Sequence, residues 1–350
     1  MRAPSTTDVV LEVKDLSVGF PTDDGVVQAV RGVSYTLRRG EVLGIVGESG
    51  SGKSVTSLAI MGLLPRTARV TGSVRLGGRE LVGASYDELA KVRGKQVSMV
   101  FQDPISSLNP VYSVGWQLAE GVRAHNDLTK KQAWERSIEL LDLVGIPNAR
   151  DRAANYPHEF SGGMRQRVVI AMAIANDPDV LIADEPTTAL DVTVQAQILE
   201  TLDVAREATN AAMVLITHDL GVVAGVADRV LVMYAGKPVE IGSVDDIYYR
   251  PRMPYTMGLL ASIPRLDQQT GGALQPIPGS PPSLLNLPPG CPFSSRCTYR
   301  IEVCDQTEPA LLQVDGLVHS AACHVASTFT GDGSVEERVE ASLAADGPAR

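Results

Sequence analysis

The first two thirds of the chain alternate short apolar runs with longer amphipathic stretches. Runs such as 180–183 and 211–216 contain almost no polar residue, which is typical of strands buried on both faces of a parallel sheet. The alternation therefore predicts an α/β fold with a mainly parallel sheet between Val9 and about Ala235. The segments predicted as strands are 11–13, 35–37, 41–46, 73–76, 96–101, 180–184, 213–217 and 229–234.

The pattern changes at two places along the chain. Residues 130–144, KKQAWERSIELLDLV, have apolar positions at helical spacing, and the segment from about 104 to 160 is predicted to be a mostly helical insertion. After Gly236, proline and glycine become dense enough to interrupt any long element, above all in 276–292. Residues 328–350 are small and polar, which predicts a disordered tail. The expected parts of the chain are 1–242, 243–327 and 328–350.

The charge balance and the length of the apolar runs argue against some classes of protein. The sequence has 31 basic and 41 acidic residues, and its formal net charge of -10 disfavours a nucleic-acid-binding protein, because such proteins usually present a basic surface. No apolar run approaches the roughly 18–20 residues that cross a bilayer, and the N-terminal residues have no apolar stretch of signal-peptide length. We therefore expect a cytoplasmic protein that reaches a membrane only through another protein.

A phosphate-binding loop is the strongest local signal in the sequence. Residues 47–54 read GESGSGKS, which matches G-x-x-x-x-G-K-[ST], between an apolar strand and a helix-compatible run. Backbone N–H groups of such a loop cradle phosphates, while Lys53 would reach the β- and γ-phosphates and Ser54 would bind Mg²⁺. The motif alone indicates nucleotide binding without choosing among kinases, GTPases, motors and transport ATPases. The predicted loop residues are Gly47, Ser49, Gly50, Gly52, Lys53 and Ser54.

Two carboxylates follow the apolar strand VLIADE at 180–185. Asp184 ends the strand, where a carboxylate can hold Mg²⁺ through water. Glu185 is one residue further and is placed to act as general base toward a water aligned on the γ-phosphate. A solvated strand end is the alternative interpretation, and the preceding phosphate loop makes it weak.

A second predicted helix start carries glycines. FSGGM at 160–164 places Ser161, Gly162 and Gly163 before the helical run VVIAMAIA, which again forms an anion-binding geometry. Two such sites in one chain are explained if two subunits pair head to tail, each giving this motif to the nucleotide of the other.

Together these motifs resemble the ATP-binding subunits of ABC transporters. FSGGMRQR is similar to the ABC signature and lies in the family position before the Walker-B strand. The resemblance implies that Gln102 senses Mg²⁺ and the attacking water, that Asp191 belongs to a D-loop (TALD), and that His218 contacts the γ-phosphate. It also makes Phe20 the aromatic that stacks on adenine, with a core or surface role as the alternative.

The resemblance covers residues 9–242 and implies the architecture as well. The expected fold is an α/β P-loop NTPase (RecA-like) core with an antiparallel β subdomain, the helical insertion and a cysteine-containing C-terminal extension. One departure from the family pattern is Met164, where glutamine is common. Its side chain lacks a polar contact, but Ser161 and the glycine amides remain, so we expect a working site with altered nucleotide contact.

The C-terminal third resembles a narrower group within this family. The segments PYTMGLLASIPRL, IPGSPPSLLNLPPGCPFSSRC, CDQTEPALL and HSAACH, with QDPISSLNP at 102–110, are similar to ATPases of peptide and nickel importers. The resemblance implies a subunit that uses ATP and Mg²⁺ to power import of di- or oligopeptides, with nickel import as the competitor. The implied partners are a second, related ABC ATPase subunit, two transmembrane permease subunits and an extracytoplasmic peptide-binding protein. The implied location is the cytoplasmic face of the cell membrane.

Non-transport ABC ATPases are the alternative from another class. Those of DNA repair need a long heptad coiled coil between phosphate loop and signature, but only about 105 residues without sustained heptads separate the two here. Translation-associated members carry two nucleotide domains and a basic linker, whereas this acidic chain has one phosphate loop. Both are disfavoured.

The four cysteines of the chain lie within one window and follow the spacing C-x5-C-x6-C-x18-C. In a cytosolic chain such a cluster suggests a metal site, and spacing alone allows Zn²⁺, an iron–sulfur cluster, or free thiols and disulfides. The family resemblance favours a [4Fe–4S] cluster. His319 and His324 are expected to be surface residues and no ligands. The predicted cluster ligands are Cys291, Cys297, Cys304 and Cys323.

Overall fold

The structure, a computed structural model, describes residues 8–188, 191–263, 277–315 and 319–329. Its centre is an eight-stranded sheet with the order β11-β12-β10-β9-β3-β8-β7-β6. The five strands from β9 to β6 in this order run parallel, while β10, β12 and β11 continue the sheet antiparallel. The strands are β3 (Val42–Val46), β6 (Val97–Val100), β7 (Val180–Asp184), β8 (Ala212–Thr217), β9 (Arg229–Tyr234), β10 (Lys237–Ser243), β11 (Leu312–Asp315) and β12 (His319–Ala321).

The parallel strands are the apolar runs of the sequence. Every residue of β3, β6, β7 and β8 is buried, because helices cover one face of this part of the sheet and α1 with the antiparallel sheet covers the other. The predicted strands in this part of the chain are confirmed to within about two residues at each end.

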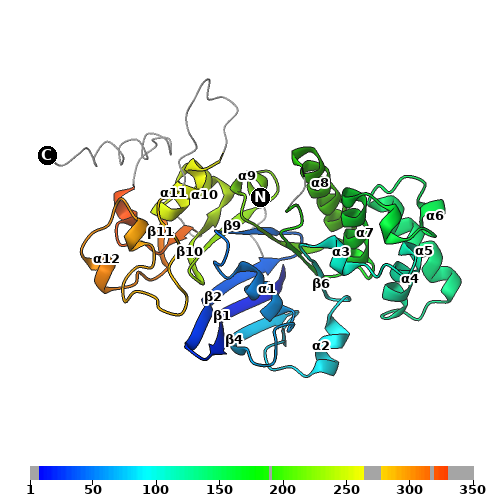
Figure 1. The fold of residues 1–350 in the computed structure, drawn as a ribbon, viewed down its shortest axis with the longest axis horizontal. Helices are drawn as coiled ribbons and strands as arrows, with labels where there is room; N and C mark the ends of the chain where they lie inside the picture. The colour runs from blue at the N-terminus through cyan, green and yellow to red at the C-terminus, as the bar shows by residue number, and fades with distance from the viewer. Residues whose placement is uncertain (1–7, 189–190, 264–276, 316–318, 330–350) are drawn as a thin grey trace, which may run out of the picture.

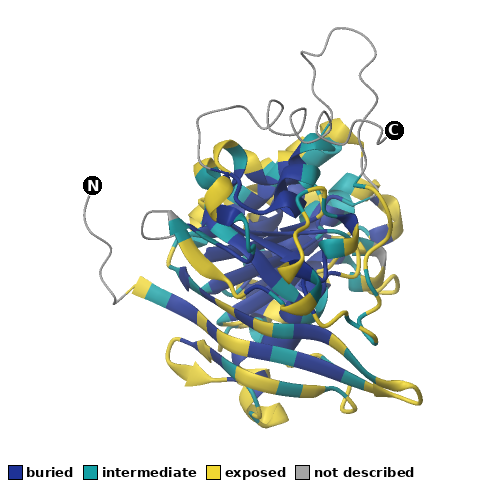
Figure 2. Cartoon of the chain, turned by 90° about the vertical axis from the view of Figure 1, so that its left-hand side faces the viewer, coloured by how far each residue is buried: buried dark blue, intermediate teal, exposed yellow. Residues whose placement is uncertain are grey.

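A second sheet lies below the first in Figure 1 and is antiparallel, with the order β2-β1-β4-β5. Figure 2 shows its long hairpin at the edge of the molecule, with buried and exposed residues following one another along each strand. The short apolar runs predicted at 11–13, 35–37 and 73–76 lie inside these longer strands. The bounds are β1 (Val9–Thr22), β2 (Gly25–Arg38), β4 (Arg69–Leu76) and β5 (Arg79–Glu80).

Helices α4, α5, α6 and α7 form the right-hand end of the molecule in Figure 1. The helix predicted at 130–144 is confirmed, and it begins at a capping box in which Thr129 accepts from the Gln132 N–H. Helices α4, α5 and α7 pack on one another around an apolar cluster that continues into the sheet. The helices up to residue 224 are α1 (Lys53–Ile60), α2 (Tyr86–Val92), α3 (Pro104–Ser107), α4 (Val114–Arg123), α5 (Lys130–Leu143), α6 (Ala149–Arg152), α7 (Gly162–Ile174), α8 (Val192–Thr209) and α9 (Leu220–Ala224).

The chain after residue 243 forms the other end of the molecule and returns to the central sheet. It contains α10 (Val244–Tyr249), α11 (Pro254–Ala261), η3 (Ser294–Arg296), α12 (Val303–Gln306) and η4 (Ala326–Thr328). As predicted, no helix or strand lies between 277 and 292. Strand β12 pairs with β10, so the extension is joined to the core by backbone hydrogen bonds. The predicted disordered tail falls, from residue 330 onward, outside the described residues.

The expectation that His319 lies on the surface is wrong. Its side chain is 1% exposed, and its Nε2 lies 2.9 Å from Oε1 of Glu240, which is itself fully buried in β10. Burial follows from the pairing of β12 with β10, which the sequence pattern did not reveal. His324 is partly exposed, with its Nε2 2.9 Å from the carbonyl oxygen of Thr307.

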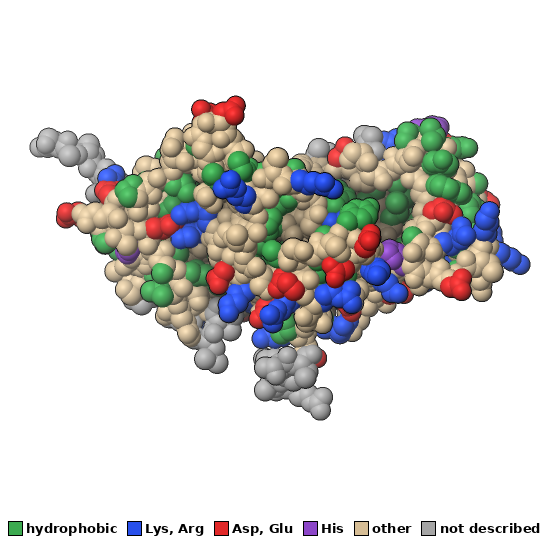
Figure 3. Space-filling model, turned by 90° about the horizontal axis from the view of Figure 1, so that it is seen from below, with side chains coloured by type: hydrophobic (Ala, Val, Ile, Leu, Met, Phe, Trp, Pro, Cys, Tyr) green, Lys and Arg blue, Asp and Glu red, His purple; other side chains and the backbone are tan. Residues whose placement is uncertain are grey.

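Two surface properties bear on the kind of partner. In the described part of the chain, no helix combines the length and the apolar character needed to cross a bilayer. On the face drawn in Figure 3, acidic and basic side chains lie intermixed, without a broad basic area on that face.

Candidate nucleotide-binding and hydrolysis site

The phosphate-binding loop connects the end of β3 to the start of α1. Gly47 and Gly52 have φ angles of 154° and 100°, which L side chains rarely adopt. A Cβ on Gly47 would lie 2.2 Å from the carbonyl oxygen of Met233, and one on Gly52 would lie 2.4 Å from that of Ala29. These glycines are therefore required by close backbone contacts as well as by the turn itself.

Lys53 begins α1 and points back into the loop. Its Nζ donates to the carbonyl oxygens of Gly47 at 2.7 Å and Glu48 at 3.0 Å, and the residue is 4% exposed. Burial lowers the pKa of Lys53, and the nearby carboxylates of Glu185, Asp184 and Glu48 oppose this shift. The structure thus holds the ammonium group inside the concavity that the loop amides form.

Of the three predicted Mg²⁺ ligands, Ser54, Gln102 and Asp184, the first and the last are joined by a hydrogen bond. Ser54 Oγ donates to Asp184 Oδ1 at 2.9 Å, across 130 residues of sequence. Burial raises the pKa of Asp184, with the Ser54 hydrogen bond and Lys53 acting in the opposite direction and Glu185 adding to the rise. A hydroxyl and a carboxylate at this distance are a donor set that suits Mg²⁺, which prefers oxygen ligands and keeps several waters.

The three predicted catalytic side chains meet at one carboxylate oxygen. Oε2 of Glu185 accepts from Gln102 Nε2 at 3.3 Å and lies 3.6 Å from Nδ1 of His218. Thr188 Oγ1 donates to the same oxygen at 2.9 Å. Glu185 also has a φ of 47°, an uncommon conformation for a residue with a side chain.

The signature residues lie elsewhere on the chain. Ser161 is the N-cap of α7, and its Oγ accepts from the N–H of Met164 at 3.4 Å, as predicted for a helix start. Gly163 faces α8, since a Cβ there would lie 3.0 Å from Val194. In the described residues, no hydrogen bond of Ser161, Gly162 or Gly163 reaches the phosphate loop.

The remaining predicted nucleotide contacts have local structural roles. Asp191 caps α8 by accepting from the N–H of Val194 at 3.0 Å, and the intervening residues 189–190 of the D-loop lie outside the described residues. Phe20 lies in β1 opposite Val27 and is half-buried against the apolar cluster under the antiparallel sheet. The predicted contacts of Asp191 and Phe20 with a nucleotide therefore stay predictions.

The four cysteines gather in the extension at the opposite end from α5. Cys291 and Cys304 are buried, Cys297 and Cys323 are partly buried, and all belong to one apolar cluster without disulfides. Burial, together with charge on the other cysteines, raises the pKa of Cys297 to about 11 and that of Cys323 to about 12. Backbone N–H groups of residues 299 and 325 donate to these two sulfurs. Among the described residues, however, no three His, Cys, Asp or Glu side chains are arranged to hold a metal ion.

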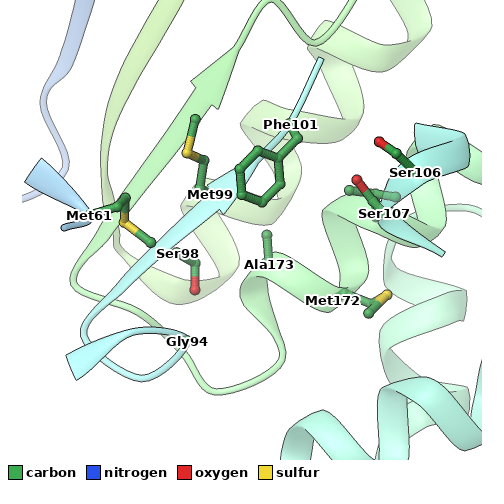
Figure 4. Close-up of a pocket in the computed structure, with 10 residues that line it drawn as sticks. Met61, Gly94, Ser98, Met99, Phe101, Ser106, Ser107, Met172 and Ala173 are labelled. Atoms are coloured by element: carbon green, nitrogen blue, oxygen red, sulfur yellow. The ribbon is translucent and has the colours of Figure 1, made fainter. Parts of the chain in front are cut away.

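A groove of about 510 Å³ lies between β6 on one side and helices α3 and α7 on the other. Figure 4 shows Phe101 in the middle of it, with Met99 and Ser98 of β6 on one side and Ser106 and Ser107 of α3 on the other. Its lining is mostly apolar, and Phe101 is 39% exposed.

Sequence reasoning missed two residues that contact the phosphate loop. Tyr255 accepts a hydrogen bond from the backbone N–H of Glu48 at 2.8 Å, and Arg296 forms an ion pair with the Glu48 carboxylate. The only local signals are a glutamate at a variable position of the loop motif and an arginine beside a cysteine. Neither signal indicates that the two meet across 248 residues.

Two family models match the chain. One described as ABC transporter matches residues 30–188, and one described as oligopeptide/dipeptide transporter, C-terminal region, matches residues 239–304. Solved structures give the same fold. The dimeric structure of a post-hydrolysis state of the ATP-binding cassette MJ0796, bound to ADP and Pi, matches with a TM-score of 0.59 and 26% identity, over 67% of this chain and 98% of that one.

Curated relatives are similar over most of this chain. The oligopeptide transport ATP-binding protein OppD of Mycobacterium tuberculosis is 58% identical over 92% of this chain, which spans only 53% of that protein. OppD of Salmonella typhimurium is 54% identical over 88% of this chain and 92% of its own length. The dipeptide transport ATP-binding protein DppD of Bacillus subtilis is 56% identical over 86% of this chain and 90% of its own length. With the phosphate loop, the strand-end carboxylates and the signature helix in place, this chain belongs to the ABC transporter ATP-binding proteins, in their oligopeptide and dipeptide transport branch.

Proposed function

We propose that this chain is the ATP-hydrolysing subunit of an importer for di- and oligopeptides. The observation that carries the proposal is the meeting of Gln102 and His218 at the Glu185 carboxylate, beside the Ser54–Asp184 pair. The residues that we assign as general base, γ-phosphate contact and Mg²⁺ ligands are thus grouped where β6, β7 and β8 end and α1 begins.

In the proposed reaction, positioning and charge supply most of the rate acceleration. Lys53 and the loop amides hold the β- and γ-phosphates, and Ser54 and Asp184 hold the Mg²⁺ of Mg-ATP. Glu185 accepts a proton from the attacking water as it approaches the γ-phosphate. His218, whose Nδ1 already lies 3.6 Å from Glu185, contacts the γ-phosphoryl group and keeps base and phosphate in register.

We propose that a complete site needs two subunits. In the described residues, no hydrogen bond joins Ser161, Gly162 or Gly163 to the phosphate loop of their own chain, which supports a role in capping a nucleotide held by a partner. The solved MJ0796 cassette is described as dimeric, which supports this arrangement. Asp191 and Phe20 would then act at the D-loop of the interface and at the adenine, respectively.

Replacing Glu185 with glutamine tests the catalytic assignment. The side chain keeps its shape but loses its basicity, so hydrolysis should fall by at least about a hundredfold while Mg-ATP binding remains. The matched control is Lys53→Ala, which should lose binding itself. Phosphate release and ATP affinity are measured on both variants. Normal turnover by Glu185→Gln would remove the general-base assignment.

The names of the relatives support peptides as the cargo. OppD and DppD proteins are described as oligopeptide and dipeptide transport ATP-binding proteins, and we extend this to the present chain. Nickel import is the second candidate. The chain would work at the cytoplasmic face of the membrane with two permease subunits, an extracytoplasmic peptide-binding protein and a second, related ATPase. ATPase activity of the co-purified complex, stimulated by peptides and not by Ni²⁺, would separate the two cargoes.

The groove around Phe101 is the proposed contact for a cytoplasmic helix of the permease. It is mostly apolar and is lined by Phe101, the residue that precedes Gln102 in the chain, so a helix bound there would respond to movements of Gln102 at the γ-phosphate. We expect Phe101→Glu to abolish co-purification with the permease subunits. Tyr86→Glu, at an exposed apolar position on α2, serves as control and should leave the complex intact. Equal recovery of permease with both variants would place the contact elsewhere.

We also propose that the four cysteines hold a [4Fe–4S] cluster, with Zn²⁺ as the alternative. Their shared neighbourhood and the N–H groups directed at the sulfurs suit thiolate ligands, although their side chains would have to rearrange to reach one metal centre. Iron, sulfide and zinc analysis of anaerobically purified protein decides between them. Iron and sulfide in equal amounts, lost in Cys297→Ser, would support the cluster, and metal-free protein would refute both.

The division of the chain into residues 1–242, 243–327 and 328–350 is also a proposal.

A further inference from the structure

Arg296 links the cysteine-bearing segment directly to the phosphate loop. It ends the short helix η3 between Cys291 and Cys297. Its guanidinium makes a bidentate pair with Glu48, with Nη1–Oε2 at 2.7 Å and Nη2–Oε1 at 2.8 Å. Paired N–H donors matched to both carboxylate oxygens fix direction as well as distance.

The guanidinium is held on every side. The Arg296 side chain is only 3% exposed, and its carbon Cζ lies 5.8 Å from the ring centroids of both Tyr234 and Phe293. Nε donates to the carbonyl oxygen of Pro278 at 2.8 Å, and Nη1 donates to the Tyr234 hydroxyl at 3.2 Å. Such a group cannot follow a displaced carboxylate, so Glu48 must come to Arg296.

Glu48 is in turn fixed at its backbone. Its N–H donates to Tyr255 of α11, and its carbonyl oxygen accepts from the N–H of Ser51 at 3.2 Å and from Lys53 Nζ at 3.0 Å. Arg296 therefore holds Glu48, whose carbonyl oxygen is one of the two acceptors that position the Lys53 ammonium group. A shift of Glu48 would move the ammonium group that contacts the phosphates.

Charge gives the pair a second effect. Glu48 places a carboxylate on a loop that binds polyanions, close enough to raise the pKa of Lys53. Arg296 compensates this negative charge, and the exposed fraction of the Glu48 side chain, 27%, leaves water only a partial role in doing so. Without Arg296, the carboxylate would repel the phosphates of a nucleotide.

We propose that Arg296 is a positioning residue that holds the phosphate loop in its nucleotide-binding form through Glu48, so that the cysteine-bearing segment sets the affinity for ATP. The inference rests on the proposed ATPase function and adds a control point outside the residues that contact nucleotide. It also gives the extension a role in the ATP site of its own chain.

The test is ATP and ADP affinity of the full chain, measured by calorimetry. Arg296→Ala should weaken both nucleotides by at least about tenfold, because it leaves a carboxylate without its buried partner. Arg296→Lys keeps the positive charge but lacks the paired guanidinium donors, so its nucleotide affinity should lie between those of wild type and Arg296→Ala. Arg300→Ala, which removes an exposed pair with Asp305 in the same segment, is the matched control and should bind as wild type.

A double variant separates repulsion from general damage. Glu48→Gln with Arg296→Ala removes both charges, so its affinity should lie closer to wild type than that of Arg296→Ala alone. In ATPase assays, Arg296→Ala should raise KM by a larger factor than it lowers kcat. Circular dichroism confirms folding, and if Arg296→Ala fails to fold, Arg296→Lys and the double variant carry the comparison.

The outcomes are distinct. Wild-type affinity in Arg296→Ala or Arg296→Lys, or strictly additive effects in the double variant, would overturn the positioning role while leaving the ATPase function intact. A wild-type chain that binds no ATP would instead overturn the proposed function, and the positioning role with it.

Discussion

Replacing His319 with alanine removes one half of a buried pair that joins the extension to the core. Glu240 is fully buried in β10, and His319 in β12 is its only described side-chain partner, at 2.9 Å. Breaking a buried pair by removing one partner typically costs about 3–5 kcal/mol, since the remaining group stays desolvated. Glu240 keeps hydrogen bonds from the backbone N–H groups of Arg252 and Met253, at 2.5 and 3.3 Å. We therefore expect the lower part of this range, about 3 kcal/mol.

Urea unfolding of the full chain, followed by circular dichroism, measures the loss of unfolding free energy. Hydrogen exchange shows where stability is lost, because the amides of β12 and β10 should lose protection before those of the parallel strands. Arg150→Ala, which breaks the exposed pair with Glu135, provides the control and should change little. An unfolding free energy of His319→Ala within about 1 kcal/mol of that of wild type would refute the reasoning that Glu240 stays desolvated and finds no substitute for His319.

Three further predictions follow from local geometry. Gly52→Ala should abolish ATP binding, because its Cβ would meet a backbone carbonyl oxygen at 2.4 Å; unchanged affinity would contradict this. Gly44→Ala should cost about 1–3 kcal/mol in urea unfolding, since its Cβ would lie 2.5 Å from buried Val223. Burial alone would raise the pKa of Asp246, but the Ser243 hydroxyl and N–H hold that pKa below its ordinary value. Ser243→Ala should therefore cost about 1 kcal/mol at neutral pH, and unfolding at lower pH should show the loss shrinking as Asp246 becomes protonated in the folded state.

Local motifs predicted which residues gather at the candidate site, for physical reasons. Gln102, Asp184 and His218 follow strands that run parallel, so their side chains gather at one sheet edge, and Glu185 turns toward them. The long antiparallel strands were predicted only as short pieces, because their exposed faces interrupt the apolar pattern. The Arg296–Glu48 contact has no periodic signature, since it depends on how the extension folds back.

The return of the extension to β10 has a consequence for shortened forms of this chain. A protein cut after residue 243 would keep the phosphate loop and the catalytic strands, yet it would expose the hydrogen-bonding edge of β10 and leave Glu240 facing water. Unpaired strand edges invite pairing between molecules. A minimal ATPase made in this way is therefore expected to self-associate through β10, and its activity would report on that aggregate rather than on the isolated core.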